Sequence, residues 1–210
     1  MRPSGAASHL DLFEQPAGFQ QAAKGEGECT RSRGSCEGLP RVARLIHAPA
    51  SHSMAGMWQG SVVSIHITPA AGQPMETVPE ARAVAGRGLE GDRYSLGIGY
   101  YSKTPGPGGR ELTLIETEAL EALGALGIKL SAAESRRNVA TAGVPLNHLV
   151  GREFWIGAVR LRGTRLCEPC KYLEGLTQPG AMLALVHRGG LRAQILNDGV
   201  IRVGDTITPA

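Results

Sequence analysis

Glycine and proline interrupt this chain more often than regular secondary structure tolerates. The 210 residues include 29 Gly and 13 Pro, which together make one residue in five. Inside a helix, Gly costs about 1 kcal/mol and Pro about 3 kcal/mol relative to Ala, so long helices are disfavoured. Short strands joined by tight turns remain, and closing them into a barrel removes exposed strand edges. The sequence therefore predicts a mainly β, barrel-like fold with a few short helices.

The first 56 residues differ in character from the remainder. They are rich in Ala, Gly, Ser, Gln and Arg and show no sustained hydrophobic period. Such composition is typical of a disordered or loosely attached segment. We expect residues 1–56 to form a non-conforming N-terminal extension and residues 57–210 to form one β-barrel domain.

Charge and aromatic content limit the possible partners. The net charge is only +3, and three Phe, four Tyr and two Trp are too few for a broad base-stacking platform. No segment approaches the roughly 20 apolar residues of a membrane span, and the N-terminus does not resemble a secretory signal. Four Cys do not suggest a disulfide scaffold. We expect a cytoplasmic protein that binds neither nucleic acid nor membrane.

The kind of basic residue points to a small anionic ligand. From residue 57 onward, 13 of the 16 basic residues are Arg. The guanidinium group presents a rigid fork of donors to carboxylate and phosphate and stays charged when partly buried. A coding bias that replaces Lys by Arg would give the same composition.

Local patterns predict the order of the secondary structure but no βαβ alternation and no internal repeat. Alternating β-branched residues indicate strands, and acids followed by an apolar stripe indicate a helix. We expect a strand from Gly60 that Pro69 ends, a short strand near 81–85, a strand at 112–115, a helix after Thr117, a turn of helix near 145–150, an extended hairpin at 153–166, a short helix opened by Gln178 and Pro179, and a hairpin at 191–208 with its turn at Asn197-Asp198-Gly199.

The segment Cys167-Glu168-Pro169-Cys170 carries the clearest chemistry. A C-x-x-C pair is a redox dithiol, half of a zinc site, or one functional thiol beside a second one. The redox interpretation requires a preceding βαβ unit and a helix start, and neither is evident. The zinc interpretation requires two further ligands, and His148 and His187 are not at paired spacing.

Basic residues around this segment favour the single-thiol interpretation, with a buried structural cysteine as the alternative. Arg160, Arg162 and Arg165 precede the two cysteines, and Lys171 follows them. Nearby cations lower the pKa of a thiol and favour the thiolate, which attacks electrophiles and binds soft metals. One of the two cysteines is therefore a candidate functional thiol.

Three other segments combine glycine with charge, and each alone is a weak signal. "GRGLEGDRY" places Asp92 beside Arg93, and "ESRRNVATAG" places Arg136, Arg137 and Asn138 together. Forked donors of this kind suit phosphate or pterin recognition, although solvated loops and turns are the commoner fate. "HRGG" at 187–190 offers His187 or Arg188 to a site, or simply ends a helix whose dipole favours cations. We interpret Asp205 as a structural turn residue.

Taken in order, these segments resemble the MOSC family. The matching blocks are "GLEGDRY", "RELTLIETEAL", "RRNVATAGVPLNHLVGREFWIGAVRLRGTRLCEPC" and "RGGLRAQILNDGVIRVGDTI", which span about Trp58 to Thr208. The resemblance implies a β-barrel-like fold and a cysteine in an Arg-x-Pro-Cys-like block that carries sulfur or coordinates molybdenum. Cys170 matches that cysteine, so the resemblance makes Cys170 the candidate catalytic and metal-binding residue, whereas Cys167 stands outside the pattern as a bystander or a resolving thiol. The cofactor-binding positions that we carry over are Arg137, Asn138, Arg93, Asp92 and Arg188.

Three alternative functions remain, of which the resemblance implies the first two. In the first, a molybdenum cofactor bound through Cys170 reduces N-hydroxylated or related small molecules and receives electrons from a donor protein. In the second, Cys170 accepts sulfur from a cysteine desulfurase as a persulfide and delivers it to molybdenum cofactor or metal–sulfur assembly. In the third, the domain is a non-catalytic module for an anionic ligand. Full sulfurases of the family also carry a pyridoxal-phosphate domain, for which this chain has no room, so pyridoxal phosphate is not expected to bind here.

Overall fold

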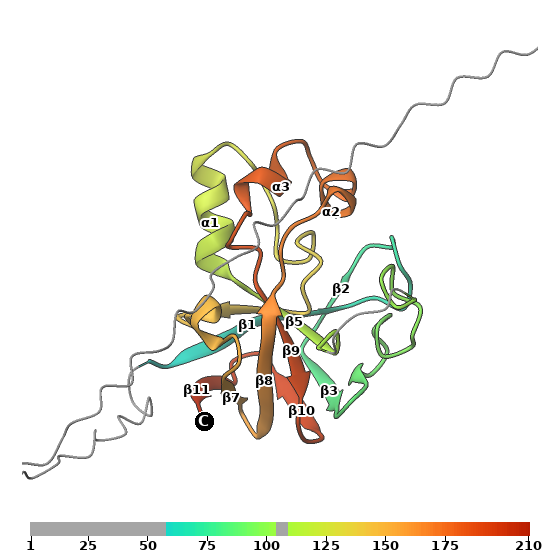
Figure 1. Cartoon of the computed structure of the whole chain (residues 1–210), viewed down its shortest axis with the longest axis vertical. Helices are drawn as coiled ribbons and strands as arrows, with labels where there is room; N and C mark the ends of the chain where they lie inside the picture. Colours follow the sequence, from blue (N-terminus) through green and yellow to red (C-terminus); the bar gives the residue numbers. More distant parts are fainter. Residues whose placement is uncertain (1–57, 104–108) are drawn as a thin grey trace, which may run out of the picture. The chain divides into compact units, whose positions relative to one another are not determined.

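The computed structural model describes residues 58–103 and 109–210. The extension predicted at residues 1–56 lies outside the described residues. Within them, strands dominate and the helices are short (Figure 1). The elements are β1 (Gly60–Ile67), β2 (Glu76–Val78), β3 (Glu80–Val84), β4 (Gly88–Leu89), β5 (Leu112–Glu116), α1 (Thr117–Ala125), β6 (Val139–Ala142), the 3-10 helix η1 (Leu146–Leu149), β7 (Glu153–Ile156), β8 (Val159–Leu166), α2 (Lys171–Leu176), α3 (Ala181–Ala184), β9 (Leu191–Ile195), β10 (Gly199–Arg202) and β11 (Thr206–Pro209).

Seven strands close into a barrel. Their order is β11-β7-β8-β9-β5-β6-β1, and β1 pairs again with β11, while β2 extends the sheet beyond β1. Large apolar side chains fill the interior, among them Leu112, Leu114, Phe154 and Leu161. Closure leaves no open edge among these seven strands, which is the advantage expected for short strands. The mainly β, barrel-like prediction is confirmed.

A smaller sheet of β10, β3 and β4 packs on the same core. Ala83 and Leu89 from this sheet are completely buried and belong to the barrel's apolar cluster. Ile201 of β10 joins them. The sheet pairs strands that are more than a hundred residues apart, because Val200 lies opposite Arg82.

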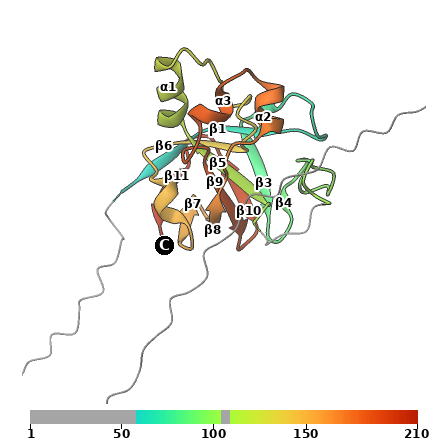
Figure 2. The same cartoon turned by 45° about the horizontal axis from the view of Figure 1, so that its top comes forward.

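The α-helices α1, α2 and α3 gather at one end of the barrel (Figures 1 and 2). Between them and the strands lies a second apolar cluster that includes Ile115, Leu123, Leu173 and Leu185. The sequence analysis predicts no βαβ alternation. This prediction is wrong, because β5, α1 and β6 form one βαβ unit with parallel strands. The return strand β6 has only four residues and follows an irregular stretch, so the local pattern does not reveal it.

The predicted hairpin at 191–208 is also wrong. The strand β9 pairs with β8 and β5, and β10 joins β3 in the other sheet. The turn residues bond to other parts of the chain instead: the Asn197 side-chain oxygen accepts from the Arg160 N–H, and the Asp198 carboxylate accepts from the Ala85 N–H. The helix α2 was not predicted, whereas the hairpin of β7 and β8 is confirmed.

None of the helices within the described ranges has the length and apolar character needed to cross a membrane.

Candidate functional site

A pocket lies where the outer face of β5 and β9 meets α2 and the loop that follows β4. We call it the main pocket. All four tyrosines of the chain line it, together with both cysteines of the C-x-x-C segment and four arginines. These residues are Tyr94, Tyr100, Tyr101, Tyr172, Cys167, Cys170, Arg93, Arg136, Arg137 and Arg192.

Cys170 is a half-buried free thiol immediately before α2, at its N-cap position. A helix start at this cysteine was not evident from the sequence. Burial by itself raises the pKa of the thiol, but hydrogen bonding from Tyr101, from the backbone of Leu173 and Tyr172, and the charge of Arg137 together lower it below its usual value. The geometry therefore favours the thiolate of Cys170. Cys167 is buried, with 2% of its surface exposed.

Tyr101 supplies a side-chain hydrogen bond to this thiol. Its hydroxyl donates to Cys170 Sγ at 3.4 Å. This bond, followed by burial, raises the pKa of Tyr101 to about 12, so the phenol keeps its proton at neutral pH. Arg110 holds the segment in place by donating to the Tyr101 carbonyl at 2.6 Å. The neighbouring Tyr100 stacks on Tyr172 of α2 with ring centroids 4.0 Å apart.

Arg137 positions the backbone around the cysteines. Its buried guanidinium donates to the carbonyls of Gly189 at 2.7 Å, Cys167 at 2.8 Å and Ser135 at 2.9 Å. Three separate backbone segments thus depend on one side chain. The predicted cofactor residue Arg137 does line the pocket, but much of its hydrogen-bonding capacity is used within the protein.

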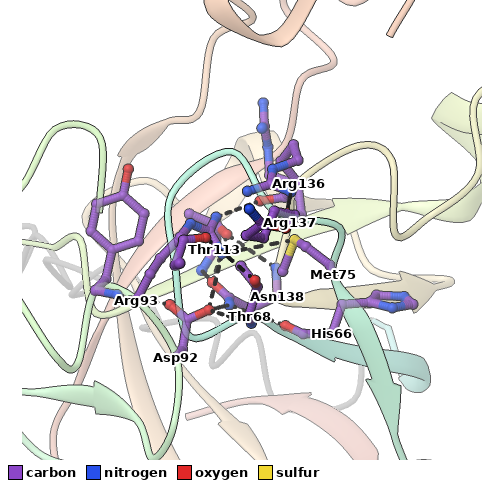
Figure 3. A network of polar contacts seen from close by, with 12 residues as sticks. His66, Thr68, Met75, Asp92, Arg93, Thr113, Arg136, Arg137 and Asn138 are labelled. Atoms are coloured by element: carbon purple, nitrogen blue, oxygen red, sulfur yellow. Dashed lines mark hydrogen bonds and ion pairs between the residues drawn. The ribbon is translucent and has the colours of Figure 1, made fainter. Parts of the chain in front are cut away.

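Beneath the pocket, Asp92, Arg93 and Asn138 form a buried polar network (Figure 3). The Asp92 carboxylate pairs with Arg93 at 3.0 Å and accepts from the Asn138 amide at 3.2 Å. The Asn138 side-chain oxygen accepts from the Thr113 hydroxyl at 2.8 Å, and its amide also donates to the His66 carbonyl. Asp92 and Asn138 therefore support Arg93, and only Arg93 of the three reaches the pocket lining.

Arg136 adds a cation to the pocket at a strained position. Its backbone φ is 64°, in the left-handed region that a non-glycine residue rarely adopts. The Arg136 carbonyl accepts from Arg93 at 3.2 Å, and its guanidinium donates to the Gln73 carbonyl. Burial, followed by the charge of Arg93, lowers the pKa of Arg136. Strain of this kind persists where the surrounding structure enforces it, often at functional sites.

The "HRGG" segment contributes through its glycines rather than through its charged residues. Arg188 is exposed and outside the lining, and His187 is exposed and pairs with Glu168 at 3.2 Å. A Cβ on Gly189 would lie 2.6 Å from the Cys167 carbonyl, and the Cys167 N–H donates to the Gly190 carbonyl at 2.7 Å. The two glycines let this segment pack directly against the cysteine loop.

The basic residues before the cysteines separate into two groups. Arg160 pairs with Glu153 at 2.7 Å, and Arg162 is exposed, so neither lines the pockets at the thiol. Arg165 lies beside Cys170 in a neighbouring pocket. Asp205 is a structural turn residue as expected, since its carboxylate accepts from the Arg202 N–H at 2.8 Å.

The tyrosines were missed by the sequence analysis. Tyr100 and Tyr101 lie in a Gly- and Pro-rich segment that reads only as a loop, and Tyr172 belongs to the unpredicted helix α2. Four tyrosines spread over 79 residues carry no local pattern. Only the folded chain brings all of them to one pocket.

The described parts of the chain contain no group of three or more His, Cys, Asp or Glu side chains arranged to hold a metal ion. This arrangement gives no support to the zinc interpretation. What the pocket offers is one activated thiol, forked cations and aromatic rings. Such a set can hold a flat, anionic organic molecule close to a thiolate.

The fold and the site thus define a small β-barrel protein with a thiol at the edge of an arginine-lined pocket. The sequence model of the MOSC domain matches residues 102–208, just over half of the chain, and the chain belongs to this family. No curated protein matches the sequence significantly.

Solved structures with the same fold include three bacterial proteins. The YuaD protein from Bacillus subtilis has a TM-score of 0.61 at 17% identity, covering 72% of this chain and 97% of that one. YiiM from Geobacillus stearothermophilus has a TM-score of 0.54 at 14% identity, covering 72% and 75%. YiiM from Escherichia coli has a TM-score of 0.50 at 18% identity, covering 71% and 69%. At these identities the likeness concerns the fold.

Proposed function

We propose that this MOSC protein binds a molybdenum cofactor with the Cys170 thiolate as the protein's ligand to the metal, and that it reduces N-hydroxylated or related small molecules. Membership of a family associated with the molybdenum cofactor supports the metal. The observation that carries the proposal is a thiol whose pKa is lowered, on the wall of a pocket that Arg93, Arg136 and Arg137 also line. Cys170 is the proposed catalytic residue.

The residues present fit such a cofactor chemically. A thiolate is a soft donor that suits molybdenum, and since the described residues form no larger ligand cluster, an organic cofactor would bring the remaining ligands. Arg93, Arg136 and Arg137 would face its anionic groups, and the tyrosine rings would pack on its conjugated system. When bound, the cofactor would supply the electron transfer that removes oxygen from the substrate.

Entry of the cofactor requires a movement of the tyrosine segment. The free volume between the lining side chains is about 50 Å³, enough for water but not for a pterin. Tyr100 closes the pocket by stacking on Tyr172, and 56% of its surface is exposed. Its side chain can therefore swing outward without disrupting the core. Within the closed site, Tyr101 orients the Cys170 sulfur and keeps its own proton.

The proposed reaction also defines partners and a compartment. Reduction consumes electrons, so we propose an electron-donor protein in addition to the small-molecule substrate. Both cysteines of the described ranges are free thiols, which suits the reducing cytoplasm. Pyridoxal phosphate has no place in this scheme.

Elemental analysis tests the proposal directly. The protein is produced in a host that makes the cofactor, and molybdenum per chain is measured for the wild type, Cys170→Ala and the matched control Cys167→Ala. We expect near-stoichiometric metal in the wild type and the control, and a loss of most of it in Cys170→Ala. A wild type free of molybdenum would overturn the proposal.

A persulfide carrier is the second candidate, because an accessible thiolate needs no metal for that role. Cys170 is half-buried and reachable from two pockets. Incubation of the metal-free protein with cysteine and a cysteine desulfurase, followed by mass spectrometry, tests this role. A carrier gains one sulfur atom on Cys170, and Cys170→Ala gains none.

A further inference from the structure

A second pocket shares Cys170 with the main pocket, and its cations are arranged differently. We call it the arginine pocket. It has about 170 Å³ of free volume, which suits a small ligand. Its lining consists of Arg110, Arg165, Arg192, Tyr101, Glu168 and Cys170.

Two of these arginines face each other across neighbouring strands. Arg165 of β8 lies directly opposite Arg192 of β9 in the antiparallel register. Like charges in that position repel and destabilise a sheet. Burial, and then the charges of Arg192 and Arg110, lower the pKa of Arg165. Repulsion between Arg165 and Arg192 therefore destabilises this part of the barrel.

A β-bulge creates this arrangement. Leu161 and Gly163 of β8 lie opposite Ile195 and Ala193, all on the barrel's interior face. Regular alternation would turn Arg165 to that same interior face. The register shifts between Gly163 and Arg165, and the extra residue moves the Arg165 side chain to the outer face beside Arg192. Bulges that redirect a side chain in this way are common next to active sites.

The charges of Arg165 and Arg192 are not paired with acidic side chains among the described residues. Within residues 58–103 and 109–210, the guanidinium groups of Arg165 and Arg192 have no ion pair, and the Arg165 Nε is buried without a hydrogen-bond acceptor. Glu168, the carboxylate of this pocket, accepts instead from the His187 backbone N–H at 3.1 Å and from its ring at 3.2 Å. A buried donor without an acceptor is costly and is normally satisfied by a ligand or water.

We propose that the arginine pocket binds an oxyanion group, a carboxylate or a phosphate, of the small-molecule substrate that is reduced next to Cys170. Arg165 and Arg192 line the same volume as the Cys170 sulfur, and a forked contact with an oxyanion there would offset their repulsion. The inference deepens the proposed function, and rests on it, by assigning an anionic substrate class. Binding of the anion itself does not depend on molybdenum.

Alkylation of the metal-free protein tests the pocket apart from the cofactor. Iodoacetate and iodoacetamide both form an S–C bond at the Cys170 thiolate as iodide leaves, but only iodoacetate carries a carboxylate. Rates at Cys170 are followed by mass spectrometry of its peptide for the wild type and for Arg165→Gln/Arg192→Gln. We expect the ratio of the iodoacetate rate to the iodoacetamide rate to fall about tenfold or more in the double variant. The double variant should also fold, because it removes a repulsive pair.

The matched control is Arg162→Gln, which removes an exposed cation from the same strand and outer face. Its rate ratio should stay within about twofold of the wild type. An equal fall of both rates in the double variant would mean that the arginines act only on the thiol's pKa, and would overturn the inference. So would a control that lowers the ratio as much as the double variant does.

Two further measurements test anion binding in this pocket and separate the substrate from the cofactor as the source of the oxyanion. Inorganic phosphate should slow iodoacetamide at Cys170 in the wild type and not in the double variant. Molybdenum content should be the same in both proteins when they are made in a cofactor-producing host. Metal that falls in the double variant would place a phosphate of the cofactor in this pocket and overturn the assignment to substrate.

Discussion

The Tyr101 hydroxyl lies 3.4 Å from the Cys170 sulfur and donates a hydrogen bond to it, across 69 residues of sequence. The same contact lowers the pKa of the thiol and raises the pKa of the phenol to about 12. The hydrogen bond therefore favours the thiolate form of Cys170 and the protonated form of Tyr101. This pair links the loop after β4 to the start of α2 and determines the chemistry of the site.

Replacing Tyr101 by Phe should make Cys170 less reactive at neutral pH. Without the hydroxyl, the pKa of the thiol rises, and each unit of pKa reduces the thiolate about tenfold. We expect iodoacetamide to alkylate Cys170 about 3- to 10-fold more slowly at pH 7, with rates converging in alkaline solution where both proteins hold a thiolate. The measurement is the pH profile of the alkylation rate.

The control for this experiment is Tyr100→Phe, which keeps the ring that stacks on Tyr172 and leaves the Tyr101 hydrogen bond to the sulfur in place. Its pH profile should match that of the wild type. In Cys170→Ala, the pKa of Tyr101, followed by phenolate absorbance, should fall toward the ordinary value of 10.0. Identical alkylation profiles in wild type and Tyr101→Phe would contradict the role of the hydrogen bond.

Arg137→Gln should destabilise the whole domain. The change leaves the carbonyls of Ser135, Cys167 and Gly189 without their donor in a buried setting. An unsatisfied buried group costs about 1–3 kcal/mol, and partial entry of water limits the sum, so we expect a loss of roughly 3 kcal/mol in the free energy of unfolding. Urea denaturation measures it.

Arg137→Lys tests whether the fork or the charge is responsible. Lysine keeps the charge but cannot reach three carbonyls at once, so it should lose most of the same stability. The exposed Arg162→Gln should change stability by less than about 0.5 kcal/mol. A fully stable Arg137→Lys would show that charge alone suffices.

Composition and short motifs predict the class of fold and a candidate thiol, but not the geometry around that thiol. Frequent Gly and Pro favour short strands, and the C-x-x-C segment with its basic neighbours favours a functional thiol, which the family resemblance assigns to Cys170. Both are local signals. The strand β3 pairs with β10, and β6 pairs in parallel with β5. No local sequence pattern indicates that these segments pair with each other.

The arrangement of the site residues shows the same limit. Arg188 looks like a cofactor residue because it belongs to a matching block, yet it is exposed and away from the pocket. Arg165 looks like one more basic neighbour, yet a single bulge turns it toward Arg192. Asn138 looks like a ligand-binding amide, yet its bonds go to Asp92, Thr113 and His66. Register and burial decide such roles, and both arise from long-range packing.

Asn138→Asp should create a pH-dependent defect beneath the pocket. The new carboxylate would lie where the amide now donates to Asp92 at 3.2 Å, and two buried carboxylates at that distance cannot both ionise cheaply. One of their pKa values is raised in the native state, so the native protein binds more protons than the unfolded chain. Stability is then lowest at neutral pH, by roughly 2–3 kcal/mol, and recovers as the pH falls toward 5.

Urea denaturation at pH 7.5 and pH 5 measures this effect. The matched control is Asn147→Asp, an exposed amide that donates to the His187 carbonyl, and it should show no comparable recovery. If Asn138→Asp were equally destabilised at both pH values, loss of the amide's hydrogen bonds and not carboxylate repulsion would account for the defect.

His66 should make the domain sensitive to mild acid. Its side chain is buried, with 4% of the residue exposed, and its ring nitrogens lie 2.8 Å from the Ser64 hydroxyl and 3.1 Å from the Thr77 hydroxyl. Burial lowers the pKa of His66 below its ordinary 6.5. As the pH falls below 6.5, the His66 imidazole binds a proton in the unfolded chain, whereas in the native protein it stays neutral until a lower pH. Stability contributed by the neutral imidazole is therefore present above pH 6.5 and is lost as the pH falls through the native pKa, by at most about 1.4 kcal/mol per pH unit.

Urea denaturation between pH 7.5 and 5 should show this loss in the wild type and a smaller loss in His66→Gln, whose amide does not titrate. The exposed His148→Gln is the control and should keep the wild-type slope. Equal slopes in the wild type and His66→Gln would mean that other groups govern the acid sensitivity.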